Sequence, residues 1–241
     1  IADESNPVYS PDGRYLAYSQ KRTPRFYADT QRLMLLDRTG GTTRGLTGQW
    51  DRSADGLVWA SDSKSIYGQI DDAATSRIYR FALTGGAPRA VTGASSFSGL
   101  EVAGKVAIAL RQSFSEPAAL VRLDLAKGAI TKLSDFNDGA LASLAMGKVE
   151  SVTYKGARGD PIQMWVIDPP GFDPAKKYPV YMLLHGGPHN GIQDALTYRW
   201  NAHVFANWGY IVTWHNFHGS SGFGQAFADS INPDRITLPY E

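Results

Sequence analysis

The sequence contains no cysteine, no long apolar run and no large excess of charge of either sign. Without cysteine among its 241 residues, disulfide bonds, thiolate metal sites and a cysteine nucleophile are excluded. The formal net charge of +1 gives no electrostatic reason to expect binding to nucleic acid or to an anionic membrane. The apolar run from Val180 to Leu184 is far too short to span a bilayer. We therefore expect no nucleic-acid partner and no membrane partner.

What is present is typical of a globular protein, since 43% of the residues are hydrophobic and 20% are charged. The length suits one large domain or two ordinary ones. The chain begins Ile-Ala-Asp-Glu, without an initiator methionine or a signal-peptide pattern. We therefore expect it to be a segment of a longer protein. For that protein we predict a periplasmic or secreted location, with the cytoplasm as the alternative.

A turn followed by an alternating strand recurs in the first half of the chain. The stretch Tyr9–Tyr18 carries Pro, Asp and Gly, the residue types that tight turns require, before alternating apolar positions. Trp59–Tyr67 repeats this pattern, with Asp62 standing 50 residues after Asp12. The aromatic side chains of this half are expected to pack between the repeated units: Tyr9, Tyr15, Tyr18, Trp50, Trp59, Tyr67 and Tyr79.

A second element recurs at nearly the same period. Leu35–Gly48 matches Arg80–Gly93 at an offset of 45, and a weaker copy, Arg122–Ser134, follows 42 residues on. Periods of this size with several strand-like runs per unit are typical of β-propeller blades. A β-sandwich with accidental similarity is the alternative. About three blades are too few to close a ring of the usual ~4–8, so further blades are expected upstream.

From about residue 149 the pattern changes to that of an α/β layer. Val149–Tyr154 and Ile162–Asp168 read as strands, and Pro179–Leu184 as a strand buried on both faces. Tyr198–Trp208 has helical spacing, and Tyr210–Trp214 reads as the next strand. A strand, a crossover helix and a strand predict a parallel pair. If the sheet ends there, its last strand is expected to have an unpaired edge prone to aggregation.

The apolar strand runs into a double-glycine turn, His185-Gly-Gly-Pro-His189. Glycine allows a tight turn and brings bare N–H groups close to a ligand. Such a loop after the third strand of an α/β-hydrolase sheet supplies an oxyanion-hole N–H. With the motifs around it, the chain resembles the prolyl oligopeptidase family of serine peptidases, in the acylaminoacyl peptidase and dipeptidyl peptidase V branch. The motifs are Lys177-Tyr-Pro-Val, His185–His189, Tyr198-Arg-Trp-Asn201, Gly209-Tyr-Ile-Val212 and Asn216–Gly224.

The resemblance implies a fold and an activity. Residues 1–147 would be the C-terminal blades of a β-propeller, and 148–241 the first part of an α/β-hydrolase peptidase domain, ending before the nucleophile elbow. The intact protein would hydrolyse short peptides through an acyl-enzyme. By resemblance, the backbone N–H of Gly187 is one oxyanion donor, supported by His185, Gly186, Pro188 and His189. The family usually has Arg where His218 stands, so this chain departs from the family pattern at that position.

The nucleophile and its partners are not expected within this chain. The family requires Gly-x-Ser-x-Gly, followed by Asp and then His. Gly219-Ser-Ser-Gly222 has neither the elbow's spacing nor a helix start at the right place. Ser220 and Ser221 are therefore interpreted as loop serines. The chain alone is predicted to be inactive, and the rest of the hydrolase domain is its expected partner besides a peptide substrate. A homo-oligomer is left open.

Other candidate sites are weaker. All five histidines fall between His185 and His218, but Gly-Gly-Pro between the first pair cannot form the helix that a zinc-binding pair needs. We predict no metal and no cofactor. His185 and His189 are expected to support the oxyanion turn by hydrogen bonds, and His215 and His218 to support the loop after the next strand. Asp71 and Asp72 are interpreted as part of a blade turn, with side chains on opposite faces. A non-enzymatic propeller binding module and an esterase of the same fold are the alternatives.

Overall fold

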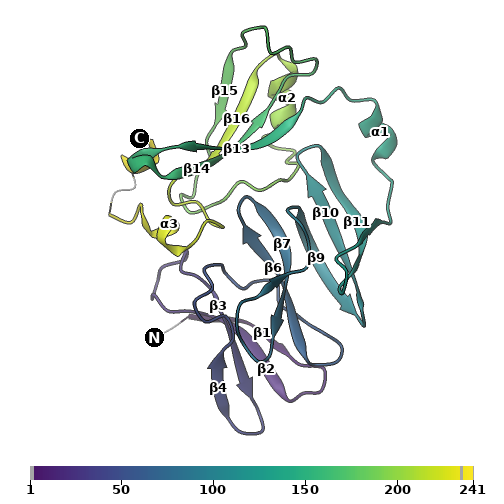
Figure 1. Cartoon of the computed structure of the whole chain (residues 1–241), viewed down its shortest axis with the longest axis vertical. Helices are drawn as coiled ribbons and strands as arrows, with labels where there is room; N and C mark the ends of the chain where they lie inside the picture. Colours follow the sequence, from purple (N-terminus) through teal and green to yellow (C-terminus); the bar gives the residue numbers. More distant parts are fainter. Residues whose placement is uncertain (1–2, 234–235, 241) are drawn as a thin grey trace.

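The computed structural model describes residues 3–233 and 236–240, and it contains four four-stranded sheets that follow one another along the chain (Figure 1). The ends of the two predicted domain ranges, residues 1–2 and 241, lie outside this part. The first three sheets are antiparallel meanders, in which each strand pairs with its neighbour in sequence. The fourth sheet is mixed. No ring of sheets closes within the described residues.

The bounds of the meander strands follow the repeated sequence. The first sheet contains β1 (Asp3–Tyr9), β2 (Tyr15–Lys21), β3 (Arg32–Asp37) and β4 (Thr42–Gly45). The second contains β5 (Val58–Trp59), β6 (Ser65–Asp72), β7 (Thr75–Ala82) and β8 (Arg89–Ala90). The third contains β9 (Ser96–Ala103), β10 (Val106–Ser113), β11 (Glu116–Asp124) and β12 (Ile130–Lys132).

The repeated turn has the same hydrogen bonds in its two copies. The Asp12 carboxylate accepts from the Arg14 N–H at 3.0 Å, and Asp62 accepts from the Lys64 N–H at 3.0 Å. This bond from an Asp side chain to the backbone two residues on stabilises a turn. Gly13 has φ +71°, and Ser63, at the equivalent position, has φ +58°. Ser63 therefore adopts the left-handed backbone conformation, which glycine adopts without a steric penalty.

The second repeated element also has a structural role. It carries a Thr or Ser just after the fourth strand of each sheet, and the hydroxyl of this residue, here called the closing hydroxyl, bonds to the third strand. The hydroxyl groups of Thr47, Thr92 and Ser134 accept hydrogen bonds from backbone N–H groups of the third strand, at 3.3, 3.1 and 2.9 Å. The donors are Leu33, Ile78 and Leu120. The same three residues accept, through their carbonyls, from the backbone N–H just before each hydroxyl residue, at 2.8 Å in every copy. The weak third copy in the sequence is thus a real one.

Apolar side chains fill the spaces between neighbouring sheets. One buried cluster joins the first and second sheets and includes Leu33, Ile66 and Phe81. Another joins the second and third sheets. Of the aromatic residues expected to pack between units, Tyr15, Trp50, Trp59, Tyr67 and Tyr79 do so. Tyr9 does not, because it is 62% exposed. Its ring contacts the Arg38 guanidinium instead.

The mixed sheet has the strand order β13-β14-β16-β15. Its last two strands in sequence, β15 and β16, are parallel, as the sequence predicts. Helix α2 lies between them in the chain and packs on the sheet. The elements are α1 (Asp138–Ala142), β13 (Val149–Lys155), η1 (Ala157–Gly159), β14 (Pro161–Ile167), β15 (Val180–Leu183), α2 (Ala202–Asn207), β16 (Ile211–Asn216), α3 (Gln225–Asp229) and η2 (Leu238–Tyr240).

Three expectations about this sheet are wrong. The β15 strand is not buried on both faces, since Val180 is 60% and Met182 56% exposed. The helix begins at Ala202 rather than at Tyr198, because Asn201 caps it by accepting from the His203 N–H at 2.9 Å. The last strand in sequence, β16, is not an edge strand, because it lies between β14 and β15; the edge strands of the described sheet are β13 and β15.

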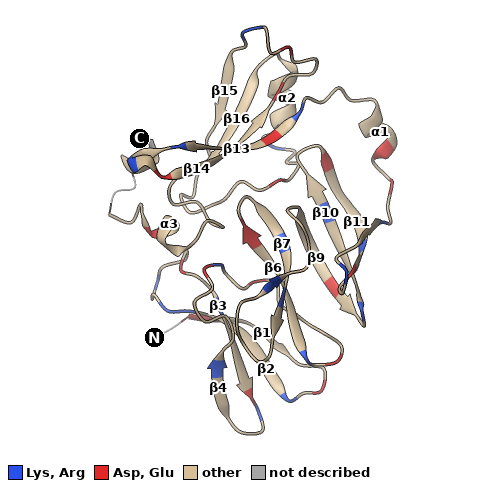
Figure 2. Ribbon diagram, in the orientation of Figure 1, with Lys and Arg blue, Asp and Glu red and all other residues tan. Residues whose placement is uncertain are grey.

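Acidic and basic residues are scattered over the strands, helices and loops (Figure 2). Within the described part of the chain, no helix has both the length and the apolar composition that a membrane crossing requires.

Candidate functional site

The double-glycine turn follows the end of β15 and precedes the loop that leads to α2. Gly187 has φ +138°, a value that L side chains rarely adopt. A Cβ on Gly187 would lie 2.9 Å from Cγ of Asn190, closer than side chains approach. The turn therefore requires glycine at position 187 for both conformation and space.

The turn faces a small cavity of about 160 Å³. Among the described residues, none accepts a hydrogen bond from the Gly187 N–H. A backbone donor without a partner beside a cavity is what an oxyanion site requires. The lining residues are Leu184, His185, Gly186, Gly187, Pro188, Phe217 and Pro239.

The two carbonyls beside this N–H both have partners. Nδ2 of Asn190 donates to the Gly186 carbonyl at 2.9 Å. The hydroxyl of Tyr27 donates to the Gly187 carbonyl at 2.9 Å. Tyr27 stands in the loop between β2 and β3 of the first sheet, 160 residues away in sequence. The first sheet and the turn therefore meet directly.

His185 supports the turn from the side of the following strand. Its ring stacks on Phe217 with 4.2 Å between centroids, and Nε2 lies 3.0 Å from Oγ of Ser220. Burial lowers the pKa of His185. Ser220 is fully buried and donates its hydroxyl proton to the Phe217 carbonyl at 2.7 Å. Ser220 is thus a structural residue of the loop rather than an accessible nucleophile.

His189 supports the turn from its other end. Its Nδ1 donates to the Gly219 carbonyl at 3.0 Å, which ties the turn to the loop after β16. Its ring packs edge-on against Phe26 and Tyr27, with 5.3 Å between centroids in both pairs. His185 and His189 therefore both connect the turn to the loop after β16.

The remaining histidines contact other elements. His203 lies 3.1 Å from Oγ of Ser115, at the tip of the β10–β11 hairpin. His215 bridges Tyr154 and Thr213 on the strands, rather than supporting the loop as expected. His218 pairs with Asp160 at 3.0 Å and so holds the loop after β16 against the turn between β13 and β14.

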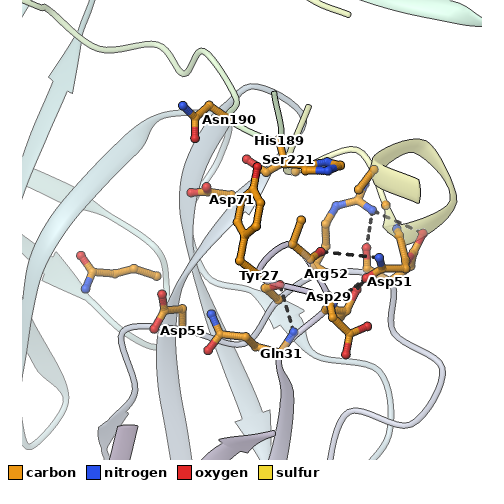
Figure 3. A pocket seen from close by; sticks show the side chains of 18 residues that line it. Tyr27, Asp29, Gln31, Asp51, Arg52, Asp55, Asp71, His189, Asn190 and Ser221 are labelled. Atoms are coloured by element: carbon orange, nitrogen blue, oxygen red, sulfur yellow. Dashed lines mark hydrogen bonds and ion pairs between the residues drawn. The ribbon is translucent and has the colours of Figure 1, made fainter. Parts of the chain in front are cut away.

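A larger cavity of about 260 Å³ lies between the loops of the first two sheets and the loops that follow β15 and β16 (Figure 3). Asp71 lines it, and burial raises the pKa of its carboxyl, with a further contribution from nearby Asp55. Asp72 points the other way, toward Arg52 at 2.9 Å and Arg77 at 3.1 Å. The expectation that these two neighbours face opposite sides is confirmed. Ser221 also lines this cavity.

Two contacts of the turn were missed by sequence reasoning. Asn190 follows the turn directly, and an amide four residues after Gly186 could have been considered as a partner. Tyr27 gives no local signal, because its bond to Gly187 depends on how the first sheet meets the fourth.

Comparison with known proteins gives a consistent result. A sequence model of the prolyl oligopeptidase family matches residues 196–236. Dipeptidyl-peptidase 5 of Porphyromonas gingivalis is 32% identical over 232 residues, which cover 96% of this chain and 34% of the relative. Dipeptidyl-peptidase 5 of Porphyromonas endodontalis is 35% identical over 232 residues, with the same coverage of both chains. The chain thus spans about a third of the length of these relatives.

Solved structures agree in fold. The acylaminoacyl peptidase of Pyrococcus horikoshii superposes with a TM-score of 0.76 at 21% identity, over 91% of this chain and 34% of that one. Dipeptidyl peptidase 4 of Porphyromonas gingivalis superposes with a TM-score of 0.72 at 18% identity, over 97% of this chain and 35% of that one.

Proposed function

Because this chain belongs to the prolyl oligopeptidase family of peptidases, we propose that its full-length protein is a serine exopeptidase or oligopeptidase that hydrolyses short peptides. The observation that carries the proposal is the turn after β15, where the Gly187 N–H has no acceptor within residues 3–233 and 236–240 and lies beside a cavity. The relatives that are 32% and 35% identical are dipeptidyl peptidases by name. Dipeptidyl and acylaminoacyl substrates are both proposed.

The fold is proposed to be that of a capped hydrolase. Residues 1–147 would form blades of a β-propeller, and residues 148–241 the first part of an α/β-hydrolase domain. The repeated closing bonds of the first three sheets support the blade assignment. The parallel pair β15–β16 with its connecting helix supports the hydrolase assignment. Periplasmic or secreted location stays a prediction.

In the proposed reaction, a serine outside residues 1–241 attacks the carbonyl carbon of the scissile peptide bond. The carbonyl oxygen then carries negative charge in a tetrahedral intermediate. The Gly187 N–H would donate a hydrogen bond to that oxygen, and one such donor lowers the barrier by ~3–4 kcal/mol. Collapse of the intermediate breaks the C–N bond, and the amine leaves with the proton that the serine hydroxyl lost. The acyl-enzyme that remains is hydrolysed by water, which gives the acid product and restores the serine hydroxyl.

The rest of the hydrolase domain is the proposed structural partner of this chain. It would cover exposed apolar side chains on and just after β15, and others on α2 and in the segments that flank α2. The exposed fractions there are large: Val180 60%, Met182 56%, Leu184 53%, Tyr198 84%, Trp200 50%, Val204 49% and Trp208 65%.

The experiment that tests the function is hydrolysis by the full-length protein of dipeptidyl-nitroanilides and N-acyl-amino-acid nitroanilides. Release of nitroaniline, with the dipeptide or the acyl amino acid as coproduct, is the expected result. Residues 1–241 alone are expected to release none. A full-length protein that binds peptides but cleaves none of them would favour a binding module. Cleavage of simple esters alone would favour an esterase.

A further inference from the structure

Gly187 is held by hydrogen bonds on both of its peptide groups. The peptide group before its Cα contains the Gly186 carbonyl and the Gly187 N–H. Since a trans peptide is planar, the direction of the carbonyl fixes the opposite direction of the N–H. Asn190 donates to that carbonyl at 2.9 Å. The peptide group after the Cα contains the Gly187 carbonyl, to which Tyr27 donates at 2.9 Å.

Glycine needs such support more than any other residue. It has no Cβ, so its φ and ψ angles range widely unless neighbouring groups restrict them. With φ at +138°, Gly187 lies outside the broad minima of other residues. An N–H that points in several directions stabilises an oxyanion less, because a preorganised donor costs no reorganisation during reaction.

The loop that carries Tyr27 is itself well supported. The Asp29 carboxylate accepts from the Thr23 N–H at 3.0 Å and from the Arg22 N–H at 2.5 Å. Burial alone would raise the pKa of Asp29, but these backbone bonds and Arg32 outweigh it and lower the pKa. Nζ of Lys21 donates to the Tyr27 carbonyl at 2.8 Å. The Tyr27 hydroxyl is thus presented to the turn by an ordered loop.

We propose that Tyr27 is a positioning residue of the oxyanion site, acting together with Asn190 to fix the direction of the Gly187 N–H. The inference rests on the proposed peptidase function. It makes the first sheet a contributor to the reaction rather than only a cover over the site. Tyr27 acts through the Gly187 carbonyl and is not itself an oxyanion donor.

The test is the variant Tyr27→Phe in the full-length enzyme. This variant keeps the ring that packs on His189 and removes only the hydroxyl. We expect kcat to fall about 10-fold while KM changes by less than about twofold, because misplacement of a catalytic group affects the transition state most. Tyr9→Phe is the control, since Tyr9 is an exposed tyrosine of β1.

A second measurement separates positioning from general loss of structure. A peptide aldehyde forms an oxyanion on the serine, whereas the same peptide ending in an alcohol does not. Tyr27→Phe should weaken inhibition by the aldehyde about 10-fold and leave the alcohol unchanged. An unchanged kcat and aldehyde inhibition, or equal weakening of both inhibitors, would overturn the proposal. If the wild type cleaves no peptide, the proposed function fails and the inference falls with it.

The double variant Tyr27→Phe/Asn190→Ala tests whether both residues act on the same group. Since both hold Gly187, the combined loss in kcat is expected to be smaller than the product of the two single losses. A full product would mean that the two residues act independently, which contradicts the proposal.

Discussion

The first three sheets and the fourth sheet differ in how they bury apolar side chains. In the meander sheets, Leu33, Ile70 and Leu123 are fully buried, because each sheet packs on its neighbour. In the mixed sheet, the side chains of Val180 and Met182 on the edge strand are more than half exposed. The first and second sheets and the second and third sheets thus bury apolar side chains against each other, whereas the side chains of Val180 and Met182 on the mixed sheet have no such cover within the described residues. The exposed edge strand agrees with the finding that the chain spans only 34% of the length of a relative.

The largest expected effect is on the stability of the buried region. Leu33→Ala should lower the free energy of unfolding by ~2–5 kcal/mol, because it leaves a cavity in a closed core. Met182→Ala should cost less than about 1 kcal/mol in residues 1–241, since its side chain is 56% exposed. Urea denaturation measures both.

The same pair of variants in the full-length protein sharpens the comparison. There Met182→Ala should become clearly destabilising, because the remaining hydrolase domain would cover it. Equal small costs in both contexts would show that this face stays open.

Under the proposed peptidase function, Gly187→Ala should have the next largest effect, on catalysis by the full-length protein. The added Cβ would meet Asn190 at 2.9 Å and would be strained at φ +138°. Displacement of the N–H should lower kcat by ~10²–10³-fold. Gly86→Ala is the matched control, since Gly86 also has a positive φ, +107°, but has open space around it. A kcat that falls equally in both variants would argue against a donor role for Gly187.

The smallest expected effect is the change in folding stability when either of two neighbouring carboxylates, Asp71 and Asp72, is replaced. Burial raises the pKa of Asp71 above 3.8, so its folded form resists ionisation. Asp71→Asn should therefore stabilise the fold by on the order of 1 kcal/mol at pH 7. The gain should disappear as the pH falls below 3.8, because wild-type Asp71 is then protonated in both states.

Asp72 should behave in the opposite way. Burial would raise its pKa, but hydrogen bonds from Tyr79 and Arg52 outweigh this and lower it below 3.8. Its stabilisation is present above pH 3.8 and is lost as the pH falls through the folded pKa. Asp72→Asn should therefore destabilise the fold at pH 7. Thermal unfolding of the two variants from pH 3 to 8 provides the measurement, and the same sign for both would contradict the assignment.

The sequence predicts those features that depend on local patterns. The offsets between Asp12 and Asp62 and between the Leu/Val-Thr-Gly segments correspond to real structural repeats, because each repeat makes the same local hydrogen bonds. The parallel pair β15–β16 follows from its strand–helix–strand pattern. The exposure of β15 could not be predicted, since an apolar strand reads the same whether or not its face is covered.

The site is predicted less completely than the fold. The double-glycine turn and its flanking histidines are visible in the sequence because the chemistry and the spacing are local. The Tyr27–Gly187 bond joins residues 160 apart. Its existence depends on the packing between two units, and no periodicity or motif reports that packing.

The bond between a closing hydroxyl and the third strand has a consequence for how such units vary. In all three sheets the hydroxyl residue and the N–H it accepts from are 14 residues apart. The fourth strand within that interval ranges from two to four residues. Hairpins and connecting segments outside these 14 residues can therefore gain or lose residues, whereas the spacing between the third-strand N–H and the closing hydroxyl stays the same. Sequence alignments of further units should be anchored at the serine or threonine rather than at the glycines of the turns.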